Sequence, residues 1–66
     1  MNIGDRIELL SMPDDPDPVP TGTQGTVESI TRVPMRGKSF TQVGVKWDNG
    51  RTLSLVMPPD RVKVVT

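Results

Sequence analysis

The sequence predicts an all-β protein. Short segments in which apolar and polar residues alternate recur along the chain, and no segment has the three-to-four-residue apolar repeat of an amphipathic helix. Seven prolines and six glycines supply turn signals between these segments. Sixty-six residues are enough for only one small domain, so we expect a single domain over residues 1–66.

Two segments in the first half of the chain alternate as strands do. In residues 5–10 (DRIELL), Ile7 and Leu9 share one face and charged residues share the other. In residues 26–33 (TVESITRV), the alternation slips between Val27 and Ile30. An extra residue at Ser29 would turn both apolar side chains inward, so the slip predicts a β-bulge there.

Residues 41–47 (TQVGVKW) alternate cleanly, with Val43, Val45 and Trp47 on one face. Asn49-Gly50 follows almost at once, and this pair supplies the positive φ angles of a tight hairpin turn. We therefore expect Trp47 to pack in the core beside the hairpin and not to serve as a ligand platform.

The last two expected strands are residues 51–56 (RTLSLV) and 61–65 (RVKVV). Pro58 and Pro59 lie between them and have no N–H group, so they cannot extend a strand ladder. We expect a connector of one 3-10 turn at this point. Gly37 marks a flexible loop between the second and third strands.

Five short strands joined in this way are typical of a small SH3-like barrel. The barrel would have a long proline-rich first loop, a medium second loop, a tight hairpin and a one-turn connector. Closing the sheet, or nearly closing it, protects strand edges that so small a domain would otherwise expose. An OB-fold is the alternative, but it usually needs a longer chain and a helix between its middle strands.

The first loop, residues 11–22, is stiffened by proline. Each proline fixes its own φ angle and keeps the preceding residue extended. We therefore expect the loop to hold one shape over the barrel, with Gly22 allowing a turn where the loop ends. The prolines are Pro13, Pro16, Pro18 and Pro20.

The same loop carries three aspartates, Asp14, Asp15 and Asp17. A calcium loop would need a central glycine and a distal glutamate, which are missing, so we expect no metal and no cofactor. A proline-rich peptide ligand would have a basic flank, whereas this flank is acidic. Two interpretations remain: a contact surface for a basic partner, with Met12 at the base of the loop and Val19 at its tip, or a charged loop that only aids solubility.

Charge is unevenly distributed, although the chain is neutral overall. Residues 1–31 carry six acidic side chains and one basic, whereas residues 32–66 carry seven basic and two acidic. Folding can interleave the two halves or separate them into an acidic loop and a basic face. The candidate basic face consists of Arg32, Arg36, Lys38, Lys46 and Arg51.

Several function classes lack the residues they need. There is no histidine and no cysteine, so the commonest general base and the strongest nucleophile are missing, and we expect no enzyme. One tryptophan and one phenylalanine cannot build a proline-peptide groove or a methyl-lysine cage. The chain has no apolar stretch long enough to span a membrane and no leader-like segment, so we expect a cytoplasmic protein.

Four motifs are similar to those of a family of small uncharacterised proteins from bacteria, phages and conjugative elements. They are Ser-Met-Pro-Asp-Asp-Pro (11–16), Gly-Thr-Gln-Gly-Thr-Val (22–27), Trp-Asp-Asn-Gly (47–50) and Asp-Arg (60–61). The resemblance covers nearly the whole chain and implies an SH3-like fold, but no established activity. Residues 31–41 (TRVPMRGKSFT) are longer and more basic than the family pattern, so a function particular to this protein could lie there.

The sequence therefore predicts a non-enzymatic binding or adaptor module that acts through protein–protein contacts. The alternative is a nucleic-acid-binding barrel that uses the basic face, although a pI near 6.1 and few aromatic residues disfavour it. The partner would be an unidentified protein and not a membrane. The module would be a monomer or a weak homo-oligomer that associates through Leu10, Val56 and Val65.

Overall fold

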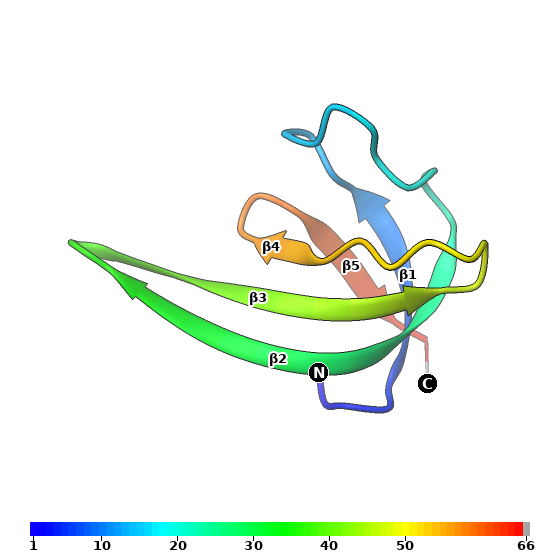
Figure 1. The fold of residues 1–66 in the computed structure, drawn as a ribbon, viewed down its shortest axis with the longest axis horizontal. Helices are drawn as coiled ribbons and strands as arrows, with labels where there is room; N and C mark the ends of the chain where they lie inside the picture. Colours follow the sequence, from blue (N-terminus) through cyan, green and yellow to red (C-terminus); the bar gives the residue numbers. More distant parts are fainter. Residues whose placement is uncertain (66) are drawn as a thin grey trace.

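The computed structural model describes residues 1–65 (Figure 1). Its strands are β1 (Arg6–Ser11), β2 (Gln24–Met35), β3 (Lys38–Trp47), β4 (Leu55–Met57) and β5 (Arg61–Val64). They form one antiparallel sheet in the order β4-β3-β2-β1-β5, and the described residues contain no helix. The prediction of an all-β protein is confirmed.

The sheet curls strongly, and the connector between its outer strands explains why. In a flat sheet, β4 and β5 would lie four inter-strand spacings apart, about 19 Å. The chain passes from Met57 to Arg61 in only four steps, which span at most about 14 Å. The sheet must therefore bend until its two ends approach each other, and Figure 1 shows this curvature clearly along β2 and β3.

The core lies on the inner face of the curled sheet. Trp47 is its largest side chain, and the indole Nε1 donates a hydrogen bond to the Leu53 carbonyl at 2.8 Å. This bond satisfies the one polar group that burial of the ring would otherwise leave without a partner. Trp47 is thus a core residue, as predicted. The buried apolar residues are Ile7, Leu9, Met12, Val19, Val27, Val43, Val45, Trp47 and Leu55.

A bulge interrupts the β2–β3 ladder between Val27 and Ser29, and it has part of the expected effect. Val27 pairs with Val45 and Ser29 with Gly44, so Glu28 is the extra residue. The bulge brings Ile30 opposite the buried Val43 and so onto the inner face, as predicted, but Ile30 remains 39% exposed and does not join the core. The reason is that β1 pairs with β2 only as far as Thr26, so no strand covers Ile30 on that side.

The hairpin after β3 forms, whereas the strand after it is shorter than expected. Gly50 has a φ of +90° and its N–H donates to the Trp47 carbonyl at 3.0 Å. The Trp47 N–H donates in turn to the Arg51 carbonyl. Residues 51–54 are irregular, because the Leu53 carbonyl accepts from the Trp47 indole, and the ladder resumes only at Leu55.

The region around Gly37 is more regular than expected. β2 continues to Met35 and β3 begins at Lys38, so only Arg36 and Gly37 remain in the turn. The expected flexible loop of medium length is therefore a two-residue turn at the end of a long ribbon. Gly37 has a φ of +72°, which suits glycine at this position.

The connector between β4 and β5 is a turn and not a 3-10 helix. Pro58 and Pro59 have no N–H group to donate to the carbonyls that a 3-10 turn would use. Both are preceded by cis peptide bonds. The turn closes instead through the Asp60 N–H, which donates to the Val56 carbonyl at 3.0 Å.

The proline-rich loop, residues 12–23, is anchored at both ends. Met12 and Val19 are buried, and the Gly22 N–H donates to the Leu9 carbonyl at 2.9 Å. The expectation that Met12 and Val19 are exposed contact residues is therefore wrong. Both side chains are apolar and belong to the core cluster, so they attach the loop to the core of the sheet.

Candidate binding groove

Two adjoining hollows lie on the described surface. One has a volume of about 320 Å³ and is lined by Asp14, Met35, Lys38, Ser39, Phe40, Val56, Pro58 and Pro59. The other has a volume of about 230 Å³ and is lined by Asp14, Asp15, Ser54, Val56, Pro59 and Asp60. Because Asp14, Val56 and Pro59 line both hollows, we treat the two as one groove.

The strand register places the apolar floor of the groove. Phe40 and Lys38 are two residues apart on β3, so their side chains leave the same face. Met35 lies opposite Lys38 on β2, and Val56 lies opposite Gln42 on β4. Residues opposite each other in an antiparallel ladder share a face, so Met35 and Val56 join Phe40 on the outer side of the sheet.

The proline-rich loop forms the acidic side of the groove. Asp14 is exposed and Asp15 half-buried, and both line the groove. Asp17 does not, because its carboxylate pairs with Arg51 at 3.5 Å. Its N–H also donates to Asp15 Oδ1 at 2.8 Å. The predicted acidic cluster is thus divided, with two carboxylates at the groove and one in an ion pair.

Asp60 closes the end of the groove and is the one buried charged residue in the described chain, at 8% exposure. Its Oδ2 accepts a hydrogen bond from the Val56 N–H at 2.9 Å, while its own N–H donates to the Val56 carbonyl. Both backbone polar groups of Val56 are therefore satisfied by Asp60. This arrangement fixes the position of β4 and occupies its free edge.

The predicted basic face is also divided. Arg32 and Lys38 belong to the β2–β3 ribbon and Arg36 to its turn, whereas Lys46 lies at the far end of β3. Arg51 is engaged by Asp17 and by the Pro18 carbonyl at 3.4 Å. Lys38 is the candidate basic residue that lines the groove.

Sequence reasoning missed Phe40, Val56, Pro58 and Pro59 as groove residues. A usable signal was present in the pair of prolines directly after the apolar run Leu55–Met57. Prolines cannot pair with a neighbouring strand, so their rings remain available as apolar surface. Of the residues considered for self-association, Leu10 and Val56 are exposed and Val65 is half-buried.

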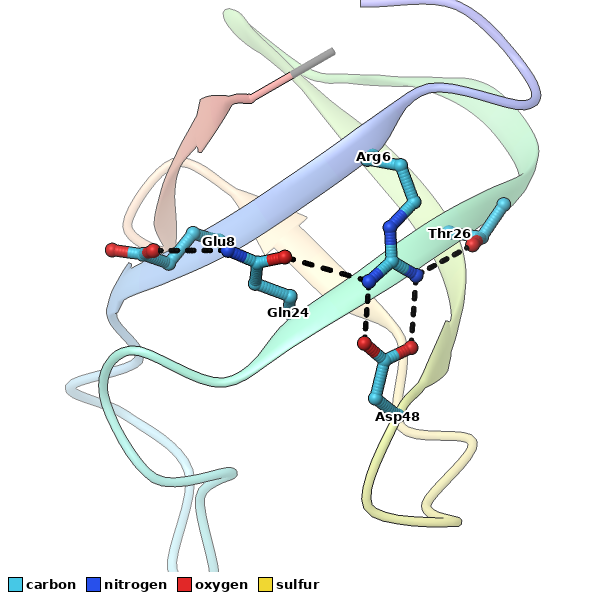
Figure 2. Close-up of polar contacts among 5 residues, drawn as sticks. All are labelled: Arg6, Glu8, Gln24, Thr26 and Asp48. Atoms are coloured by element: carbon cyan, nitrogen blue, oxygen red, sulfur yellow. Dashed lines mark hydrogen bonds and ion pairs between the residues drawn. The ribbon is translucent and has the colours of Figure 1, made fainter.

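A second polar cluster lies on the outer face of β1 and β2 (Figure 2). The Arg6 guanidinium donates to both carboxylate oxygens of Asp48, to Thr26 Oγ1 at 3.0 Å and to Gln24 Oε1 at 3.4 Å. The side-chain amide of Gln24 donates a further hydrogen bond to Glu8 Oε1 at 3.4 Å. With its donors occupied in this way, Arg6 serves to attach the hairpin turn to β1.

The same contacts change the ionisation of the pair. Hydrogen bonds from Arg6 lower the pKa of Asp48 below its ordinary value, with the guanidinium charge adding to the effect and desolvation opposing it. The hydrogen bond to Asp48 correspondingly raises the pKa of Arg6. Both groups therefore remain charged at neutral pH.

Two further kinds of feature are absent from residues 1–65. No group of three or more acidic side chains is close enough to hold a metal ion. No helix in this part of the chain is long and apolar enough to cross a membrane.

Comparison with known proteins gives a family but no activity. The domain of unknown function DUF4314 matches residues 2–65. The chain belongs to this family. The match spans nearly the whole chain, so the expectation of a small uncharacterised family is confirmed. No curated protein and no solved structure matches the chain.

Proposed function

We propose that this chain is a non-enzymatic protein-binding module built on a small SH3-like barrel. The strand order β4-β3-β2-β1-β5 and the short connector that forces the sheet to curl support this barrel. The resemblance of its motifs to bacterial, phage and conjugative-element proteins supports a setting in bacteria or their mobile DNA.

One observation carries the proposal: separate segments converge on the groove. Asp14 comes from the proline-rich loop, Lys38 from the turn end of the ribbon and Pro59 from the connector. The floor between them is apolar, with Phe40 and Val56 contributing outward-facing side chains. A hollow with an apolar floor and charged sides is the usual form of a site that takes side chains of a partner.

The proposed contact is made through side chains and not through added strands. Asp60 already occupies the N–H and the carbonyl of Val56 on the free edge of β4. Pro34 interrupts the part of β2 that β1 does not cover, because proline has no N–H to donate. The free edge of β4 and this uncovered part of β2 are therefore poor templates for a partner strand.

Selection from a random peptide library displayed on phage tests the proposal. Val56→Arg places a charge on the groove floor, and Val64→Arg makes the same change at an exposed residue of β5 that lies outside the groove. Peptides selected on the natural chain should bind Val64→Arg unchanged and lose at least tenfold in affinity for Val56→Arg. Equal binding to both variants, or no peptide selected at all, would refute the groove as a protein-binding site.

A further inference from the structure

The ribbon of β2 and β3 extends beyond the rest of the sheet (Figure 1). β4 pairs with β3 no further than Thr41. The three pairs beyond that point, from Val33–Phe40 to Met35–Lys38, have no third strand beside them. Three pairs extend about 10 Å at the usual rise of a strand. We call residues 31–41 the arm, in which the Arg32–Thr41 pair forms the base beside β4.

The arm carries positive charge without compensation. Residues 29–47 contain no aspartate or glutamate. Arg32, Arg36 and Lys38 are exposed, and none has an ion-pair partner among residues 1–65. Arg6, Arg51 and Lys63 have such partners, whereas the other two cations outside the arm, Lys46 and Arg61, have none among residues 1–65. Three cations without ion-pair partners therefore lie on the arm of a chain that is neutral overall. This local positive charge favours an anionic partner.

The three cations surround the arm. Lys38 lies opposite Met35 in the ladder, so their side chains share one face of the ribbon. Met35 and Arg32 are three residues apart on β2, so their side chains point to opposite faces. Lys38 and Arg32 therefore also lie on opposite faces. Arg36 lies in the turn at the end. A flat or convex anionic surface would meet only one face of such a ribbon. An occupant that meets both faces and the tip must enclose the arm between two negatively charged walls.

We propose that the arm inserts into the major groove of B-form duplex DNA, where Arg32, Arg36 and Lys38 contact phosphates on both sides. This groove is about 12 Å wide and about 8.5 Å deep and admits a two-stranded β-ribbon. The free length of the arm, about 10 Å, is sufficient for that depth. Phosphate contacts carry no base information, so binding is independent of sequence. The inference shares Lys38 with the peptide groove but does not require a peptide to bind there.

Fluorescence anisotropy with a labelled 16-base-pair DNA duplex tests the inference. With three phosphate contacts, the logarithm of affinity should fall with the logarithm of salt at a slope of about −2.7, or about 40-fold between 50 and 200 mM. Double-stranded RNA of the same sequence should bind at least tenfold more weakly, because its major groove is too narrow for side chains to reach. No DNA binding at 50 mM salt would overturn the inference, as would equal affinity for RNA or for polyglutamate.

Charge-neutralising variants distinguish insertion of the arm into the DNA groove from docking of only one face of the arm. Arg32→Gln and Lys38→Gln should each lower the slope by about 0.9. Arg61→Gln is the matched control, since Arg61 is exposed, lies on β5 and has no ion-pair partner among residues 1–65. It should leave the slope unchanged. An effect of only one arm variant would mean docking on one face and would overturn insertion, and fluorescence of the buried Trp47 verifies that each variant is folded.

Discussion

Replacing Asp60 with alanine should destabilise the fold more than is usual for a substitution outside the apolar core. The carboxylate accepts a hydrogen bond from the Val56 N–H at 2.9 Å in a buried position. Asp60→Ala leaves that N–H without its partner on the edge strand. A hydrogen bond to a charged group contributes about 1.5–3 kcal/mol, so we expect a loss of about 2 kcal/mol.

That loss is large for a domain of this length. At about 0.05–0.15 kcal/mol per residue, the free energy of unfolding should be about 3–10 kcal/mol. For a domain of 60–100 residues, 2 kcal/mol corresponds to a decrease in Tm of about 8–16 °C. Asp60→Asn keeps an oxygen that can accept the bond but loses the charge, so it should cost about 1 kcal/mol.

Urea unfolding followed by Trp47 fluorescence measures these differences, because the indole is buried and changes environment on unfolding. Asp14→Ala is the matched control, since Asp14 is exposed on the rim of the same groove. It should remain within about 0.5 kcal/mol of the natural chain. If Asp60→Ala also stays within that range, the inference that Asp60 fixes β4 is refuted.

Three further predictions concern other parts of the fold. Gly25→Ala should cost about 1–3 kcal/mol, because its Cβ would lie 2.9 Å from both a backbone oxygen and an indole ring carbon. Gly44→Ala should cost less, since its Cβ meets a serine hydroxyl that can rotate away; equal losses in urea unfolding would contradict this contrast. Val19→Ala should cost about 1.5–3 kcal/mol through lost burial and a cavity, and a Tm equal to that of the natural chain would mean that the loop is not anchored by this residue. Because Arg6 holds the pKa of Asp48 below its ordinary value, ionised Asp48 stabilises the fold above its unfolded-state pKa, and this contribution is lost as pH falls through its folded-state pKa. The natural chain should therefore exceed Asp48→Asn in stability at neutral pH and converge with it under acid conditions, whereas a constant difference in a series of urea titrations from pH 7 to pH 2 would contradict the assignment.

The sequence predicted the strands well where alternation and burial coincide. Val43, Val45 and Trp47 alternate and are all buried, because β2 lies on one side of β3 and the segment from the hairpin to β4 lies on the other. Ile30 has the same apolar character but lies where β1 no longer covers β2. Periodicity identifies a face of a strand, but it does not reveal where the neighbouring strand ends.

The candidate site was only partly predictable, for a similar reason. Asp14 and Lys38 were chosen for their charge and do line the groove. Met12 and Val19 lie among prolines and aspartates, which suggests exposure, yet a loop that folds back over a small core can bury its apolar residues. The position of Phe40 beside Val56 depends on the pairing of β3 with β4, which no local pattern encodes.

Backbone ¹⁵N relaxation of the proline-rich loop tests the central claim most directly, which is that the groove exists before any partner binds. Asp14 and Asp15 line the groove, and Val19 anchors the loop beneath it. If the loop is held in place, the amides of these three residues should have order parameters near 0.85, like the strands. Values below about 0.6 would mean a freely moving loop and would contradict a preformed groove.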